Sequence, residues 1–82
     1  MKDYIDIMTG GMNKQRMEIV TIFKLEGFPF KYMIYCTLNK KHYYLAKFKG
    51  EDIVNLSTDF SDREYNLCKK IFEGVTENAI GD

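Results

Sequence analysis

The stretch RMEIVTIFKLEGFPFKYMIYCTLNKKHYYLAKFKG, residues 16–50, decides the fold of this chain. It is rich in Ile, Val, Thr, Phe and Tyr, which suit the pleated surface of a β-sheet better than a helix. Gly27-Phe28-Pro29 and Asn39-Lys40 interrupt it, because proline cannot donate a hydrogen bond to a central strand and glycine and asparagine favour turns. The pattern therefore predicts three consecutive antiparallel strands: residues 16–26, 30–38 and 42–49.

A helix is predicted after these strands, over residues 61–74. Ser61-Asp62-Arg63-Glu64 matches the capping box, in which the serine hydroxyl and the glutamate carboxylate each accept a hydrogen bond from a backbone amide of the first turn. Gly74 stands where a left-handed helix end is expected. Apolar residues recur at three- or four-residue spacing and predict one apolar stripe: Tyr65, Cys68, Ile71, Phe72 and Val75.

The chain of 82 residues has room for one small domain. We predict an α+β fold in residues 12–82, with a three- to four-stranded antiparallel β-meander over residues 16–57 and one C-terminal helix packed on one face. A weaker stretch at residues 52–56 is the expected fourth strand. Residues 1–11 are predicted to be a detachable N-terminal arm, because Gly10 and Gly11 leave the backbone free to turn.

The predicted sheet has two apolar faces but only one helix to cover them. Strand alternation places Ile19, Tyr32 and Cys36 on the face that meets the helix. The opposite face would hold Val20, Ile22, Met33, Tyr35, Tyr44, Ala46 and Phe48. Because a solvated sheet face should alternate apolar with polar residues, we expect this second face to be covered by the arm, by a second copy of the chain or by another partner.

Charge is balanced but unevenly distributed along the chain, with 12 Lys+Arg against 12 Asp+Glu. Residues 27–50 carry five lysines and no acid, whereas residues 51–82 carry eight acidic and three basic side chains. Such a division can create an electrostatic binding face, or the two segments can lie against each other and cancel.

The sequence contains no motif of a catalytic or metal site. The residues with nucleophile or metal-ligand character are Cys36, Cys68 and His42, which are scattered, whereas structural zinc needs four closely spaced ligands. No glycine-rich phosphate loop, nucleophile elbow or HExxH helix occurs. We therefore expect no catalytic residue, no enzymatic activity, no cofactor and no metal.

The cytoplasm is the expected location. No apolar run approaches the roughly 20 residues that cross a bilayer, and the N-terminus lacks the basic-then-apolar pattern of a secretory signal. Two cysteines do not make a disulfide framework, which favours a reducing compartment.

The run Lys31-Tyr32-Met33-Ile34-Tyr35-Cys36-Thr37-Leu38 follows a strand that contains Ile19-Val20-Thr21 and precedes further strands and a short, acidic-capped helix. Over residues 16–75 this pattern resembles the YrzB-like family, small uncharacterised bacterial proteins found mainly among Firmicutes. The resemblance implies a small cytoplasmic bacterial protein without an assigned activity, and it transfers no functional residue.

The composition of the second sheet face leads to the functional hypothesis. We expect a small non-enzymatic protein that self-associates, for example as a homodimer, or binds a protein partner. The expected contact residues are Lys31, Met33, Tyr35, His42, Tyr44 and Phe48. The alternative is single-stranded nucleic acid, because lysines interleave with aromatic residues between positions 28 and 48, and bases stack on aromatic side chains within positive grooves.

Overall fold

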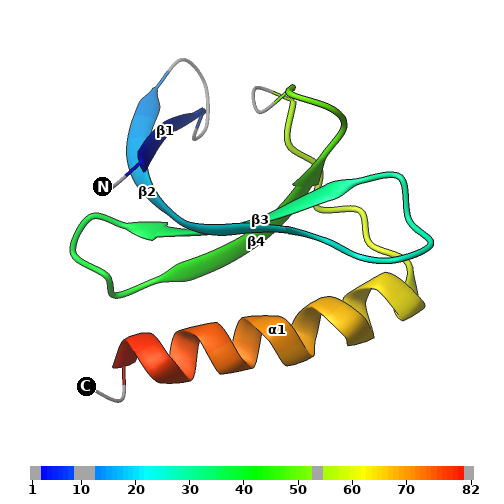
Figure 1. Cartoon of the computed structure of the whole chain (residues 1–82). Helices are drawn as coiled ribbons and strands as arrows, with labels where there is room; N and C mark the ends of the chain where they lie inside the picture. The colour runs from blue at the N-terminus through cyan, green and yellow to red at the C-terminus, as the bar shows by residue number, and fades with distance from the viewer. Residues whose placement is uncertain (1–2, 9–12, 53–54, 81–82) are drawn as a thin grey trace.

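The computed structural model describes residues 3–8, 13–52 and 55–80. In these residues it contains four strands, β1 (Asp3–Met8), β2 (Lys14–Lys24), β3 (Lys31–Thr37) and β4 (Tyr43–Phe48), followed by the helix α1 (Asp62–Ile80). The strands form one antiparallel sheet in the order β1-β2-β3-β4, and α1 lies across one face (Figure 1). The predicted α+β meander with a C-terminal helix on one face is confirmed.

Residues 3–8 of the expected N-terminal arm are the edge strand β1. β1 pairs with the first half of β2, from Asp3 opposite Ile19 to Met8 opposite Lys14. Its apolar Ile5 is 7% exposed, so the strand is anchored by burial as well as by backbone hydrogen bonds. Gly10 and Gly11, which suggested the arm, lie outside the described residues. Residues 3–8 are therefore part of the sheet rather than a detachable arm.

The weak strand predicted at residues 52–56 includes residues 53–54, which also lie outside the described residues. Just beyond this stretch, Ser57 forms an isolated antiparallel bridge with Lys47 and exchanges two backbone hydrogen bonds of 2.9 Å with it. Leu56 packs against the core. The fourth strand of the observed sheet is β1, at the other edge.

A register shift in β2 changes which of its side chains face the helix. Ile19 pairs with Tyr35, but Thr21 pairs with Ile34, so Val20 is the extra residue of a β-bulge. Cross-strand partners share a face, so Ile19 lies with Tyr35 on the face opposite α1. The expectation that Ile19 meets the helix is wrong, because a shift of one residue exchanges the two faces of a strand.

The face of the sheet opposite α1 is covered by the chain itself. β1 and the first half of β2 rise over that face (Figure 1), since a bulge bends the strand that contains it. The buried cluster there consists of Ile5, Met17, Met33, Tyr35, Ala46 and Phe48, with Ile7, Ile19 and Leu56 packed against it. Of the three covers expected for this face, the structure contains the N-terminal segment.

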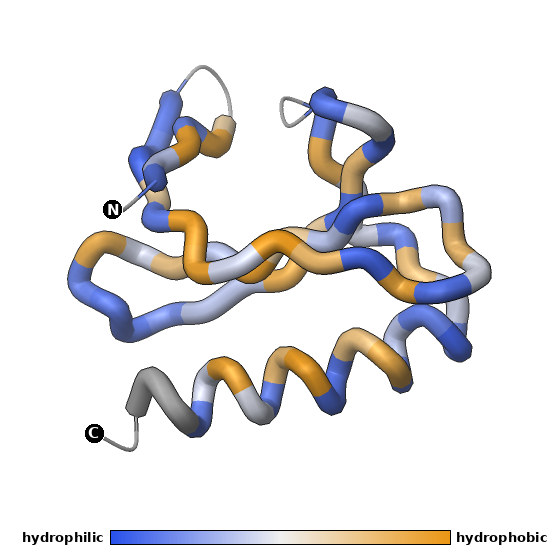
Figure 2. Tube along the Cα trace, in the orientation of Figure 1, coloured by the Kyte–Doolittle hydropathy of each residue, from blue (hydrophilic) through white to orange (hydrophobic). Residues whose placement is uncertain are grey.

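The helix α1 begins with the predicted capping box. The Ser61 Oγ accepts a hydrogen bond from the Glu64 amide at 3.2 Å, and the Glu64 Oε1 accepts one from the Ser61 amide at 3.1 Å. Glu64 and Cys68 are buried against the sheet, whereas Tyr65 is 53% exposed. Hydrophobic and hydrophilic segments alternate along α1 in Figure 2, as in an amphipathic helix. The buried stripe thus begins at Glu64 and not at Tyr65.

The helix runs past Gly74 and ends at Ile80, so the predicted end at residue 74 is wrong. The glycines with positive φ in the described residues are Gly27 and Gly50, and Gly74 keeps a helical backbone. No proline follows Gly74 in the chain, so nothing forces the helix to stop there. Within the described residues, no helix has the length and apolar character needed to span a membrane.

Gly74→Ala is expected to raise the free energy of unfolding by about 0.5–1 kcal/mol. A Cβ at this position meets nothing within 4 Å, and alanine restricts the unfolded chain more than glycine does. Urea denaturation measures the change. The matched control is Gly50→Ala, which should lower stability because Gly50 has a φ of 57°. A loss of stability in Gly74→Ala would contradict the continuous helix.

Candidate functional site

Three of the six predicted contact residues belong to the core: Met33, Tyr35 and Phe48. Their exposed fractions are 0, 8 and 3%, respectively. They do lie on the sheet face opposite α1, as expected, but they are packed in one buried cluster with residues of β1, of β2 and of the segment after β4. The sequence-based view of this face as an open contact surface is therefore corrected, because Ile5 and Ile7 of the expected arm, together with Met17, Ile19 and Leu56, cover it.

The other three predicted contact residues reach the surface at separate places. Lys31 lies at the start of β3, where its Nζ donates a hydrogen bond of 2.8 Å to Glu51. His42 is exposed just before β4. Tyr44 is 42% exposed, and its ring stacks on Tyr35 with 5.5 Å between the ring centroids. The six residues therefore do not form one continuous surface.

A buried ion pair joins the sheet to the helix. The Lys47 Nζ lies 3.1 and 3.2 Å from the two carboxylate oxygens of Glu64, and the Tyr32 hydroxyl donates to the same carboxylate at 2.7 Å. Lys47 and Glu64 are only 7% and 4% exposed. The Lys47 ammonium also lies 4.3 Å from the centre of the Phe30 ring. The buried polar atoms of Lys47, Glu64 and Tyr32 therefore find their hydrogen-bond partners in one another, in the layer between β3, β4 and α1.

The pKa shifts of Glu64, Tyr32 and Cys68 are those expected of groups that stabilise the fold. Burial raises the pKa of Glu64, but hydrogen bonds from Tyr32, Ser61 and Lys47 outweigh it and lower the pKa from 4.5 to about 2. Burial, followed by the hydrogen bond to Glu64, raises the pKa of Tyr32. Burial, with a smaller contribution from Glu64, raises the pKa of Cys68 to about 11. At neutral pH these groups are a carboxylate, a phenol and a thiol, which does not favour acid–base or nucleophilic chemistry.

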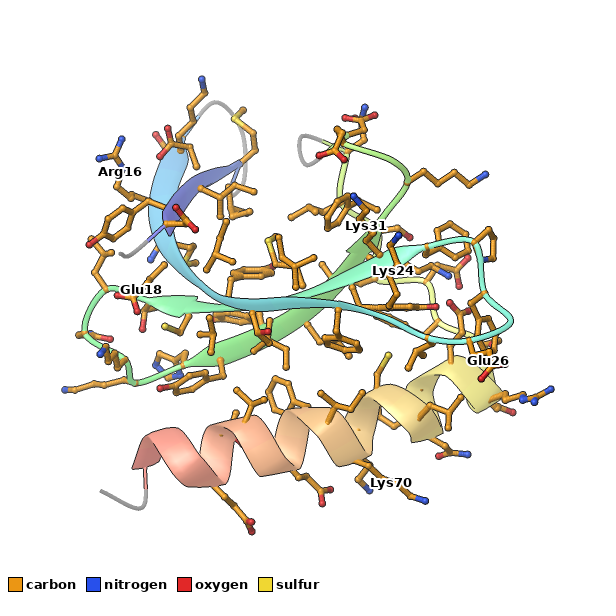
Figure 3. The ribbon with its side chains drawn as sticks, viewed as in Figure 1. Arg16, Glu18, Lys24, Glu26, Lys31 and Lys70 are labelled. Carbon is orange, nitrogen blue, oxygen red and sulfur yellow. The ribbon has the colours of Figure 1, made fainter. Side chains whose placement is uncertain are left out.

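The basic middle segment and the acidic final segment of the chain partly neutralise each other. Lys47 pairs with Glu64, and Lys31 pairs with Glu51, so each ion pair joins residues 27–50 to residues 51–82. Lys24 lies beside Lys31 as its cross-strand partner (Figure 3). Part of the charge division predicted from the sequence is thus internal to the fold.

The outer edge of β4 is the accessible feature with the clearest binding chemistry. Lys47 exchanges its backbone hydrogen bonds with Ser57 on this side of the strand. In an antiparallel strand, alternate residues direct their backbone groups to the same side, so those of Tyr43 and Leu45 also point outward. In the described part of the chain, no backbone group pairs with them there. The edge therefore presents unpaired amide and carbonyl groups.

An apolar groove runs beside this edge. Leu45, Tyr65, Phe72 and the stem of Lys69 line a space of about 170 Å³ between β4 and α1. Sequence reasoning placed Tyr65 and Phe72 in the core stripe and did not connect them with the β4 edge. The capping box alone did not reveal this, because only the structure shows that Glu64 faces the sheet and that its neighbour Tyr65 therefore lies toward the flank of the helix.

The edge strands β1 and β4 differ in the charged side chains that hinder pairing with another strand. β1 carries Asp3 and Asp6, and charged side chains hinder pairing with another strand. Asp6 also accepts a hydrogen bond from Arg16 at 3.4 Å. In contrast, residues 43–46 of β4 are Tyr, Tyr, Leu and Ala, without a charge. Of the two edge strands β1 and β4, β4 is therefore the one that is chemically suited to accept another strand.

Among residues 3–8, 13–52 and 55–80, no group of three or more His, Cys, Asp or Glu side chains could hold a metal ion.

No protein-family model matches the chain, and neither a curated protein nor a solved structure is significantly similar to it. The resemblance to the YrzB-like family therefore stays a prediction, and the functional argument depends on the geometry of the chain.

Proposed function

We propose that the protein is a small non-enzymatic interaction module that binds protein through the outer edge of β4. The observation that carries this proposal is the pair of outward-facing backbones at Tyr43 and Leu45 beside the groove formed with Tyr65 and Phe72. Such an edge recognises an extended polypeptide, because backbone hydrogen bonds supply affinity and neighbouring side-chain pockets supply specificity.

A protein partner fits this surface better than single-stranded nucleic acid does. Bases need exposed aromatic rings on which to stack, but Tyr32, Tyr35 and Phe48 of the lysine-rich segment are buried. The unpaired groups of β4 are alternating amides and carbonyls, which another polypeptide backbone matches directly. These two observations support the protein-binding form of the hypothesis.

The placement of the reactive groups supports a non-enzymatic role. Cys36 and Cys68 are both buried, and neither forms a disulfide. The carboxylate of Glu64 is held by Lys47, Tyr32 and Ser61. A catalytic site needs a nucleophile, an oriented base and room for substrate, and these side chains are enclosed instead.

A photo-crosslinker in place of Tyr65 is expected to capture a protein partner. p-Benzoylphenylalanine is an aromatic replacement for Tyr65, which is 53% exposed in the groove. Irradiation of cells that express the chain should give a covalent protein adduct, detected on a denaturing gel and identified by mass spectrometry. The control places the same group at Lys70, whose side chain points away from the sheet (Figure 3). Adducts of equal yield at both positions, or none at position 65, would contradict the proposal.

A further inference from the structure

We propose that the partner is a second copy of this chain, whose β4 pairs antiparallel with the β4 of the first copy about a two-fold axis beside Tyr44. This inference depends on the proposed function of the β4 edge and names its occupant. The two four-stranded sheets would then form one continuous antiparallel sheet, with an α1 from each copy on the same side.

The hydrogen-bonding pattern of the edge is complementary to itself. Lys47 is already bonded to Ser57, and the His42 carbonyl accepts from Thr37 within the sheet, so the open backbone groups are those of Tyr43 and Leu45. An axis beside Tyr44 places Tyr43 of each copy opposite Leu45 of the other. In each of these two Tyr43–Leu45 pairs, the backbone amide and carbonyl of both residues face the other copy. The amide of each residue then donates a hydrogen bond to the carbonyl of its partner.

The short length of the edge favours a second copy over an isolated peptide. Three residues of free edge provide few hydrogen bonds, so a stable complex there needs apolar contacts beyond the edge itself. A second copy also brings its own groove, so that Leu45 and Tyr65 of the two copies gain apolar neighbours. On the other face, the two Tyr44 rings meet, and each is already held by its stack on Tyr35.

Charges at the two ends of this interface are complementary. In the same register, Ser57 already fills the position beside Lys47 of the second copy, so Lys41 of the first copy lies outside Ser57. Asp59 follows closely along the chain, so Lys41 approaches Asp59 of the second copy. Lys41 and Asp59 are exposed and make no ion pair within the described residues. The two-fold axis repeats this contact at both ends.

Disulfide trapping at the axis tests the pairing. Opposed residues of the kind formed by Tyr44 and its copy have Cα atoms about 4.5 Å apart, which suits a disulfide. Mild oxidation of Tyr44→Cys should give a covalent dimer on a non-reducing gel. Ile22→Cys is the matched control, because Ile22 is 46% exposed on the same sheet face but lies on β2, two strands away from the β4 edge, and should stay monomeric. Oxidation of the unmodified chain tests whether the buried native cysteines Cys36 and Cys68 form a dimer by themselves.

A charge exchange provides a second measurement that does not depend on oxidation. In sedimentation experiments, Lys41→Glu or Asp59→Lys alone should raise the dimer dissociation constant by about 2- to 10-fold, and combining the two should restore it. Rescue by the combination distinguishes a contact between copies from a general effect on folding.

The outcomes separate the two proposals. A dimer trapped by Tyr44→Cys but not by Ile22→Cys, together with the charge rescue, supports the second copy. A Tyr44→Cys chain that stays as monomeric as the Ile22→Cys chain overturns it. If the photo-crosslinker at position 65 then captures a different protein, the β4 edge keeps its proposed function; if it captures none, that proposal fails as well.

Discussion

Replacing Glu64 by alanine is expected to lower the free energy of unfolding by about 3–5 kcal/mol, out of the roughly 5–15 kcal/mol typical of a folded domain. The substitution leaves the Lys47 ammonium buried without its carboxylate, and the Tyr32 hydroxyl loses its acceptor. It also removes the side chain that caps the Ser61 amide. Urea denaturation followed by circular dichroism at neutral pH measures the loss.

Asp62→Ala is the matched control for this experiment. Asp62 is an acidic residue in the same first turn of α1, but it is exposed. Its removal should change stability by no more than about 1 kcal/mol, because only its interaction with the helix dipole is lost. If the two variants lost the same stability, the buried ion pair would not be the important contact.

The same carboxylate predicts how the fold responds to acid. The pKa of Glu64 is lowered from 4.5 to about 2, so its contribution to stability is complete above about pH 4.5 and is lost as the pH falls toward 2. Glu64→Gln cannot ionise and should lack this part of the acid dependence. Denaturation curves recorded between pH 5 and pH 2 compare the two chains; parallel losses would show that other groups are responsible.

The second large effect is expected at β1, where Ile5→Ala should cost about 2–5 kcal/mol of unfolding free energy. Ile5 is 7% exposed and packs in the same cluster as Met33, Tyr35 and Phe48. Truncating its side chain leaves a cavity and weakens the cover of the sheet. The shift in the urea midpoint at constant slope measures this loss.

Ile22→Ala serves as its control, because Ile22 is also an isoleucine on a strand but is 46% exposed. It should cost less than about 1 kcal/mol. A small effect at both positions would mean that residues 3–8 do detach, as the glycines at 10 and 11 suggested on sequence grounds.

The parts of the fold that follow local rules could be predicted from the sequence. Alternation in β3 and β4 correctly assigned Tyr32 and Met33 to opposite faces, because successive side chains of a regular β-strand point to opposite sides of the sheet. The capping box correctly marked the start of α1, since both of its hydrogen bonds lie within one turn. Such features need no knowledge of distant segments.

The parts that depend on distant contacts could not be predicted in the same way. The bulge at Val20 leaves no clear mark in the sequence, yet it reverses the faces of the residues before it and bends β2. Gly74 is a typical helix end, but its neighbours sustain the helix. Lys47 was counted in a basic segment, and its burial depends on Glu64 from a separate element.

The candidate site illustrates the same limit. Individual residues such as Tyr44 and Tyr65 could be recognised as apolar and aromatic, but their exposure depends on the strand order and on the rotation of α1. Strand order decides that β4 is an edge, and a single sequence does not reveal which strand has only one neighbour. The backbone groups at Leu45 have no sequence signature at all.

Glu64 has a consequence for how the molecule loses structure. The residue whose carboxylate caps the first turn of the helix also holds Lys47 of the sheet, so this turn cannot fray without breaking the contact between the layers. Hydrogen exchange at the capped amides of Ser61 and Glu64 should therefore require an opening as costly as global unfolding, whereas helix termini usually exchange through small local fluctuations. Secondary and tertiary structure are cooperatively linked through one carboxylate.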